Sequence, residues 1–183
     1  MGNSAVQGTL ILNVMHQKGR LVSKSKGVVL LIVWFMWATG KDLDTLVRYS
    51  ISTDYYIFSS IGLEAAFFVM AGAVFFLNTS VVYCLFQPQI YGLRLLIASL
   101  SASAVYNIVA VSIALQNIPN VRAAYENGRE LRGLPVREGA MDMIFTQNAF
   151  VTSIVVTVAL YLVIGFVAYR NKSYFYAAEQ SDA

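Results

Sequence analysis

The chain has 183 residues, of which 57% are hydrophobic and 13% are charged, and its formal net charge is +3. A soluble domain usually carries about 25% charged residues, and such a shortfall is typical of a chain in contact with lipid, where ionised side chains are costly. The basic balance does not indicate nucleic-acid binding, because it comes from an acid-free cluster that precedes the first apolar stretch: Lys18, Arg20, Lys24 and Lys26. Such clusters are typical of cytoplasmic flanks that meet anionic lipid headgroups.

Residues 1–20 form an N-terminal segment that is polar at its ends and apolar in the middle. Val6, Leu10 and Val14 recur at a helical spacing, which predicts a short amphipathic helix lying at the membrane interface. The run 9–15 would also suit an extended conformation. The sequence therefore predicts an interfacial segment and leaves its local structure open.

Four apolar stretches follow, at residues 21–39, 57–86, 92–115 and 144–169. Crossing a bilayer as a helix takes about 20 apolar residues, and each of the last three stretches is long enough. These stretches predict an all-α fold, an integral membrane four-helix transmembrane bundle with short interfacial helices. One transmembrane domain accounts for residues 1–183.

The first stretch is the weakest of the four, because only residues 27–39 are uninterrupted. It reaches the length of a span if Lys24 and Lys26 extend their ammonium groups to the headgroups. The alternative is a re-entrant or interfacial helix. That alternative would leave three spans and place the two termini on opposite sides.

The connections between the stretches predict the topology. Residues 41–54 are polar, and Leu43, Leu46 and Val47 suggest a short helix on the membrane surface. The short link 87–89 requires the second and third spans to be antiparallel neighbours. The loop 116–143 contains a predicted helix opened by Asn117 and Pro119 and closed by Gly133 and Pro135.

The distribution of Lys and Arg is nearly even between the two sides of this topology. The acid-free cluster before the first span therefore decides the predicted orientation, since the first helix usually dominates. Both termini are predicted to be cytoplasmic, and the loop 116–143 is predicted to be non-cytoplasmic.

Four polar residues inside the predicted spans are candidates for a functional site: Glu64, Asn78, Asn107 and Asn148. An intramembrane carboxylate such as Glu64 suggests a proton site, an ion ligand or a partner for a cation. Since it lies near the start of an overlong span, Glu64 also fits a position at the headgroups. The asparagines predict either a polar path through the bundle or ordinary hydrogen bonds between helices.

Small residues predict close helix packing in the second and third spans. Two pairs of small residues lie four positions apart in the third span, Ala98 with Ala102 and Ser99 with Ser103. Gly62 and Ala66 show the same spacing in the second span and are the candidate partner for the small-residue face of the third span. Small residues let helix backbones approach closely, which favours association where lipid surrounds both helices.

The inventory of reactive groups predicts no enzyme, no cofactor and no metal site. His16 is the only histidine and Cys84 the only cysteine, so neither paired haem ligands nor a His–Cys metal cluster can be assembled within one chain. Cys84 lies in an apolar run, which favours a buried thiol. Asp42 and Asp44 are predicted to lie at the solvated start of a helix.

Two functions fit these observations. The first is a non-catalytic structural or accessory subunit of a homo-oligomer or of a larger membrane assembly, with lipids and other membrane subunits as partners. The alternative is a small channel or transporter formed by oligomerisation, with Glu64 and the intramembrane asparagines lining its path.

Overall fold

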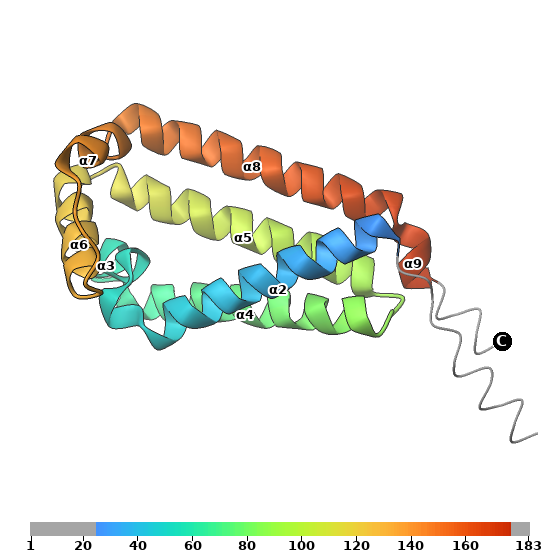
Figure 1. Ribbon diagram of the computed structural model, residues 1–183. Helices are drawn as coiled ribbons and strands as arrows, with labels where there is room; N and C mark the ends of the chain where they lie inside the picture. The colour runs from blue at the N-terminus through green and yellow to red at the C-terminus, as the bar shows by residue number, and fades with distance from the viewer. Residues whose placement is uncertain (1–24, 177–183) are drawn as a thin grey trace, which may run out of the picture.

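The computed structural model describes residues 25–176, apart from the side chain of Glu138, and the predicted N-terminal interfacial segment and His16 lie outside these residues. The described chain is all-helical and contains no strand. Four long helices lie lengthwise beside one another (Figure 1): α2 (Lys26–Val47), α4 (Glu64–Phe86), α5 (Gly92–Ala114) and α8 (Gln147–Arg170).

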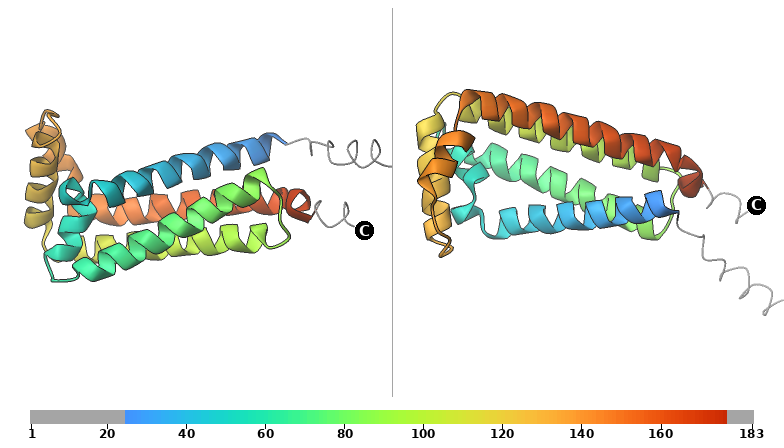
Figure 2. Two further views of the ribbon diagram at one scale, coloured as in Figure 1. Left: turned by 90° about the horizontal axis from the view of Figure 1, so that it is seen from below. Right: turned by 45° about the horizontal axis from the view of Figure 1, so that its top comes forward.

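Short helices gather at the two ends of the long helices. One end carries η1 (Tyr49–Ile51), α3 (Thr53–Ser59), α6 (Ile118–Glu130) and α7 (Glu138–Ile144), and we call it the α6 end. Figure 2 shows α3, α6 and α7 lying across the ends of the long helices. The opposite end carries α9 (Lys172–Tyr176) and the link between α4 and α5, and we call it the α9 end.

Three of the long helices are long and apolar enough to cross a membrane, namely α4, α5 and α8. The fourth, α2, is apolar as far as Thr39 and then carries Lys41, Asp42 and Asp44 in its last two turns. It nevertheless runs beside α4 and also contacts α8. Residues 43–47, predicted as a separate surface helix, are therefore the continuation of α2.

The predicted second span, residues 57–86, is interrupted in the structure. Helix α3 stops at Ser59 and α4 starts at Glu64. Between them Gly62 has a φ of +73°, while the Leu63 amide donates to the Phe58 carbonyl (3.0 Å) and the Gly62 amide to the Ser59 carbonyl (3.0 Å). This Schellman arrangement ends a helix and favours glycine at the left-handed position. Gly62 is thus a helix stop and not a packing residue.

The predicted helix in the loop 116–143 is present as α6. The Asn117 side chain accepts a hydrogen bond from the Asn120 amide, and a proline occupies the first turn. Gly133 has a φ of +67° and ends the segment with the same hydrogen-bond pattern as Gly62. The local signals that cap and end a helix were therefore sufficient to predict α6 from the sequence.

An ion-pair network ties α6 to α7. Arg122 donates from Nε to Glu126 (2.7 Å) and from Nη1 to Asp142 (2.6 Å). These hydrogen bonds, first the one to Glu126 and then the one to Asp142, raise the pKa of the Arg122 guanidinium above its ordinary value. The α6 end therefore has a polar, charged cover.

Two apolar clusters hold the long helices together. The cluster at the α9 end includes Leu31, Phe35, Leu85, Leu96, Ile164 and Phe175, and so joins all four long helices and α9. The cluster at the α6 end includes Phe58, Phe67, Ala71, Ala110, Ala114 and Val121, and joins α3, α4, α5 and α6. The buried residues of this second cluster come from α3, α4, α5 and α6, while Leu46 of α2 and Phe150 of α8 are only partly buried against it.

The described chain begins and finishes at the α9 end (Figure 1). Ser25 donates a hydrogen bond from Oγ to Asn171 Oδ1 (2.5 Å), which ties the start of α2 to the end of α8. Charges near this end are all basic among the described residues, and they are Lys26, Arg94, Arg170 and Lys172. The carboxylates of the described residues lie instead toward the α6 end.

Candidate functional site

A layer of polar side chains separates the two apolar clusters. Its centre is Asn78 of α4, which is only 3% exposed. The Asn78 amide donates from Nδ2 to Asp42 Oδ2 of α2 (2.6 Å), and the fully buried Ser99 of α5 donates from Oγ to Asn78 Oδ1. Three helices are thus joined by one chain of hydrogen bonds, which satisfies the buried polar groups of Asn78 and Ser99.

Two further hydrogen bonds extend this layer toward α3 and α8. The Tyr106 hydroxyl of α5 donates to Asp54 Oδ2 of α3 (3.0 Å). Asn107 donates from Nδ2 both to the Ser103 carbonyl (2.8 Å) and to the Tyr161 hydroxyl of α8 (3.2 Å). The polar layer therefore contacts all four long helices.

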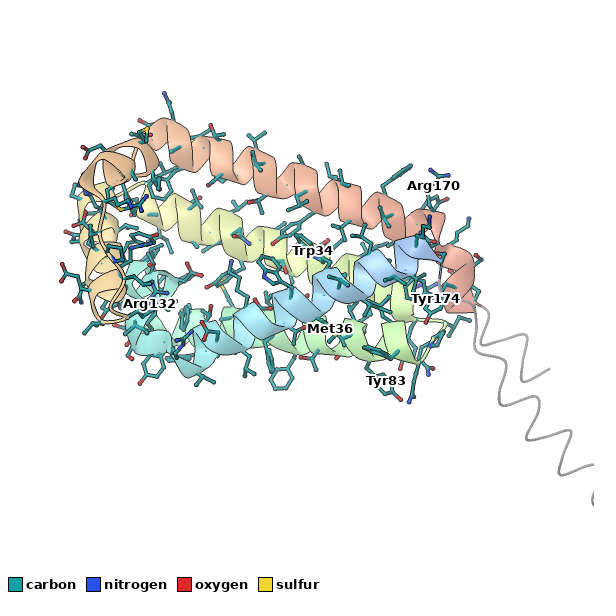
Figure 3. All side chains as sticks on the ribbon, in the orientation of Figure 1. Trp34, Met36, Tyr83, Arg132, Arg170 and Tyr174 are labelled. Carbon is teal, nitrogen blue, oxygen red and sulfur yellow. The ribbon has the colours of Figure 1, made fainter. Side chains whose placement is uncertain are left out.

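The polar layer borders a cavity of about 200 Å³ between the helices. Its lining residues of the acidic and basic types are Lys41, Asp42 and Asp54. Aromatic rings form much of the remaining wall, from Trp34, Phe35, Trp37, Tyr106 and Tyr161. Figure 3 shows Trp34 near the middle of the bundle.

A second cavity of about 220 Å³ adjoins the first at the α6 end, and we call it the vestibule. Lys41, Thr45 and Asp54 line both cavities, so the two spaces meet at these three side chains. The vestibule is otherwise lined by residues of α2, η1 and α3, by Arg48 between α2 and η1, by Tyr125 of α6 and by Arg132, which follows α6. Arg132 lies at the end of the molecule beside α3 and α6 (Figure 3).

The carboxylates in the cavity have neutral hydrogen-bond partners. Neither Asp42 nor Asp54 has a Lys or Arg nitrogen of the described chain within 4.0 Å. The nearby Asp44 differs, because it forms an ion pair with Arg48. Lys41 places its ammonium 5.9 Å from the centre of the Trp37 ring. Two acids and one base thus face the cavity.

The predicted site residues divide into two groups. Asn78 and Asn107 both line the cavity. Glu64 lies in the first turn of α4 at the α6 end, and Asn148 is exposed in the first turn of α8, so neither lines the cavity or the vestibule. Glu64 is half-buried and lies at a helix start, because α4 begins there and not at residue 57.

The predicted packing residues of α5 also divide. Ser99 and Ser103 are buried between helices, whereas Ala98 is exposed and Ala102 is half-buried. Ala66 is half-buried and packs against the apolar cluster at the α6 end. One of the two small-residue pairs in α5 therefore faces into the bundle.

The sequence analysis interpreted Asp42 as part of a solvated helix start, whereas the structure places it at the cavity, bonded to Asn78. Asp54 and the aromatic walls of the cavity were not predicted as parts of a site. The pattern that would have revealed Asp42 is the spacing of Trp34, Ala38, Asp42 and Thr45, which share one face of a helix. That pattern crosses the boundary at residues 40–41, where the apolar stretch stops. Asp54 and Tyr106 meet only through the fold, because they are 52 residues apart.

The described residues offer no group of three His, Cys, Asp or Glu side chains able to hold a metal ion. Cys84 is buried. Comparison with protein families, with curated proteins and with solved structures finds no match to this chain.

Proposed function

We propose that the protein is a multi-pass membrane protein in which α2, α4, α5 and α8 all cross the bilayer. Helix α2 has 22 residues, so it extends about 33 Å, comparable to the hydrocarbon thickness of about 30 Å. Its polar face turns toward the cavity, where Asp42 meets Asn78. Polar residues in a span are expected to face a bundle interior in this way.

The same proposal places the α9 end in the cytoplasm, with both termini on that side. The support is the set of described charges there, which are all basic, since Lys and Arg are enriched on the cytoplasmic side of membrane helices. The α6 end, with its mixed charges and its helical cover, then faces the opposite compartment. Arg94 and Arg170 would lie at the headgroups.

We propose further that the bundle binds a small solute in its cavity and passes it across the membrane. The observation that carries this proposal is the polar cavity itself, which contains two carboxylates without ion pairs and adjoins a vestibule at the α6 end. Placing such groups in a membrane domain is costly, and they mark solute pathways in membrane proteins. A purely structural bundle needs no such space.

The proposed path is closed toward the α9 end. The apolar cluster of Leu31, Phe35, Leu96 and Ile164 lies between the polar layer and that end. A solute would therefore enter from the non-cytoplasmic side and leave only after the helices rearrange. This arrangement favours a carrier over an open pore.

Cysteine accessibility tests the path. In a Cys84→Ala background, single cysteines replace Thr45 at the junction of the two cavities and Thr157 on the α8 wall. A membrane-impermeant thiol reagent added from the non-cytoplasmic side is expected to label both positions, and addition from the cytoplasmic side is expected to label neither. Leu96→Cys, in the closed apolar cluster, is the matched control and is expected to stay unlabelled from both sides.

Two results would contradict the proposal. If Thr157→Cys reacts no faster than Leu96→Cys, no aqueous route reaches the cavity. If labelling of Thr45→Cys occurs only from the cytoplasmic side, the proposed orientation is inverted.

A second candidate function is a structural or accessory subunit, which a different observation favours. Ala98 and Ser101 are both exposed on α5 and stand one turn apart. Small residues on an outer face let another helix approach closely, so this face suits a second copy or another membrane subunit. Oxidative crosslinking of Ala98→Cys in native membranes would reveal such a neighbour, and a wholly monomeric product would argue against it.

A further inference from the structure

The chemistry of the cavity suggests which class of solute it takes, an inference that rests on the solute-binding function proposed above. The carboxylates of Asp42 and Asp54 face the cavity, and Lys41 is the only described base that does so. The charge of the lining is therefore negative when all three groups are ionised. An uncompensated carboxylate inside a bundle is stabilised by an opposite charge more than by any neutral group.

The position of Lys41 leaves room for a second cation. Its ammonium lies near the Trp37 ring and outside ion-pair distance of both cavity carboxylates. Arg48, which lines only the vestibule, is paired with Asp44. The remaining vestibule base, Arg132, donates from Nε to the Gly128 carbonyl (2.8 Å). None of these bases is within ion-pair distance of Asp42.

Aromatic rings are the second feature of the cavity that favours a cation. Trp34, Trp37, Tyr106 and Tyr161 all contribute to its wall. The face of an aromatic ring attracts an organic cation, and aromatic cages around a carboxylate are suited to alkylammonium groups. A hydrated inorganic ion would gain little from these rings, and the described chain provides no cluster of three acidic, His or Cys ligands.

The size of the cavity restricts the solute further. Its volume of about 200 Å³ is below the range of about 300 to 1,000 Å³ that is typical of pockets for drug-sized ligands. We propose that the cavity binds a small organic monocation, with its ammonium group against Asp42 and its carbon skeleton against the aromatic wall.

Three probes of similar shape distinguish the effect of charge on binding from the effect of size. They are choline, its neutral isostere 3,3-dimethylbutan-1-ol and the anion 3,3-dimethylbutanoate. The chain contains only two tryptophans, and both line the cavity, so intrinsic fluorescence of the full-length protein in nanodiscs reports on occupancy. We expect choline to change the fluorescence saturably. We expect its affinity to exceed that of the alcohol and of the anion by at least about tenfold, as for other close charge pairs.

The variant Asp42→Asn keeps the size of the side chain and an oxygen that can accept from Asn78. It is expected to weaken choline binding by at least about tenfold while leaving binding of the neutral alcohol unchanged. Glu64→Gln is the matched control, because Glu64 lies on the same side of the molecule but lines neither cavity. Its choline affinity is expected to equal that of the unmodified chain.

The outcomes separate the inference from the function on which it rests. If the alcohol or the anion binds as tightly as choline, or if Asp42→Asn leaves choline binding unchanged, the organic-cation inference is overturned and the solute-binding function stands. If no probe binds although Thr157→Cys is labelled, the same inference is overturned. If no probe binds and Thr157→Cys resists labelling, both fail. If Asp42→Asn does not fold, the comparison of the three probes on the unmodified chain tests whether the cavity prefers an organic cation.

Discussion

Replacing Asn78 by Leu tests the polar layer most directly, because this side chain links three helices. The substitution keeps a side chain of similar size but removes the bond to Asp42 and the bond from Ser99. Hydrogen bonds between membrane helices contribute about 0.6 kcal/mol each on average, so their loss accounts for about 1.2 kcal/mol. Leaving the Asp42 carboxylate without its donor adds at least about 1 kcal/mol.

The expected loss in the free energy of unfolding is therefore between about 2 and 3 kcal/mol. Ser99 adds little to this sum, because a helical serine can donate to a carbonyl of its own helix, as Ser80 does to Phe76. Reversible unfolding in mixed micelles, followed by tryptophan fluorescence, measures the loss. Thr79→Val is the control on the neighbouring residue, since Thr79 is exposed and bonds only to the Phe75 carbonyl of its own helix.

A double-mutant cycle isolates the bond between Asn78 and Ser99. The variants Asn78→Leu, Ser99→Ala and the double variant are expected to give a coupling of about 0.6 kcal/mol, within an upper range of about 1.7 kcal/mol. If Asn78→Leu unfolds at the same detergent fraction as Thr79→Val, or if the cycle is additive, the reasoning about the polar layer is refuted.

Two glycines make further predictions about packing. A Cβ on Gly92 would lie 2.7 Å from Phe175 Cδ1, so Gly92→Val is expected to displace α9 and to lower stability by about 1 to 3 kcal/mol. Gly72→Ala, with nothing within 4 Å of its Cβ, is the control and is expected to stabilise by up to about 1 kcal/mol. A Cβ on Gly128 would lie 2.9 Å from the Ile51 carbonyl oxygen; Gly128→Ala is therefore expected to lower the unfolding temperature despite its better helix propensity. Thermal unfolding followed by tryptophan fluorescence measures all three, and a stabilised Gly92→Val or Gly128→Ala would contradict the packing described.

The helix class and the three candidate membrane helices follow from composition and from stretches of apolar residues, and the structure confirms them. The helix in the loop 116–143 was equally predictable, because its cap at Asn117 and its stop at Gly133 are local signals. Gly62 carries the same kind of stop signal. It was overlooked because apolar residues flank it on both sides, and hydropathy alone cannot distinguish a continuous helix from two.

The candidate site was only partly predictable. Asn78 and Asn107 were identified because polar residues in an apolar stretch stand out, and both line the cavity. Glu64 stood out for the same reason, yet it lies at a helix end. Asp42 was interpreted as part of a solvated helix start and Asp54 was not predicted as a site residue, because both lie in the largely polar connection 41–54.

Residues near one another in the sequence are enough to predict that this chain is helical, that it contains helices suited to a bilayer, and where several of those helices stop. Each of these properties depends on residues close together along the chain. Which polar groups meet depends instead on the packing of distant segments, since Asp42 and Asn78 are 36 residues apart and Asn107 and Tyr161 are 54 apart. That packing also turns the small-residue pair Ser99 and Ser103 inward while Ala98 faces outward. Helix rotation and pairing depend on the combined packing of all the helices, which no single segment encodes.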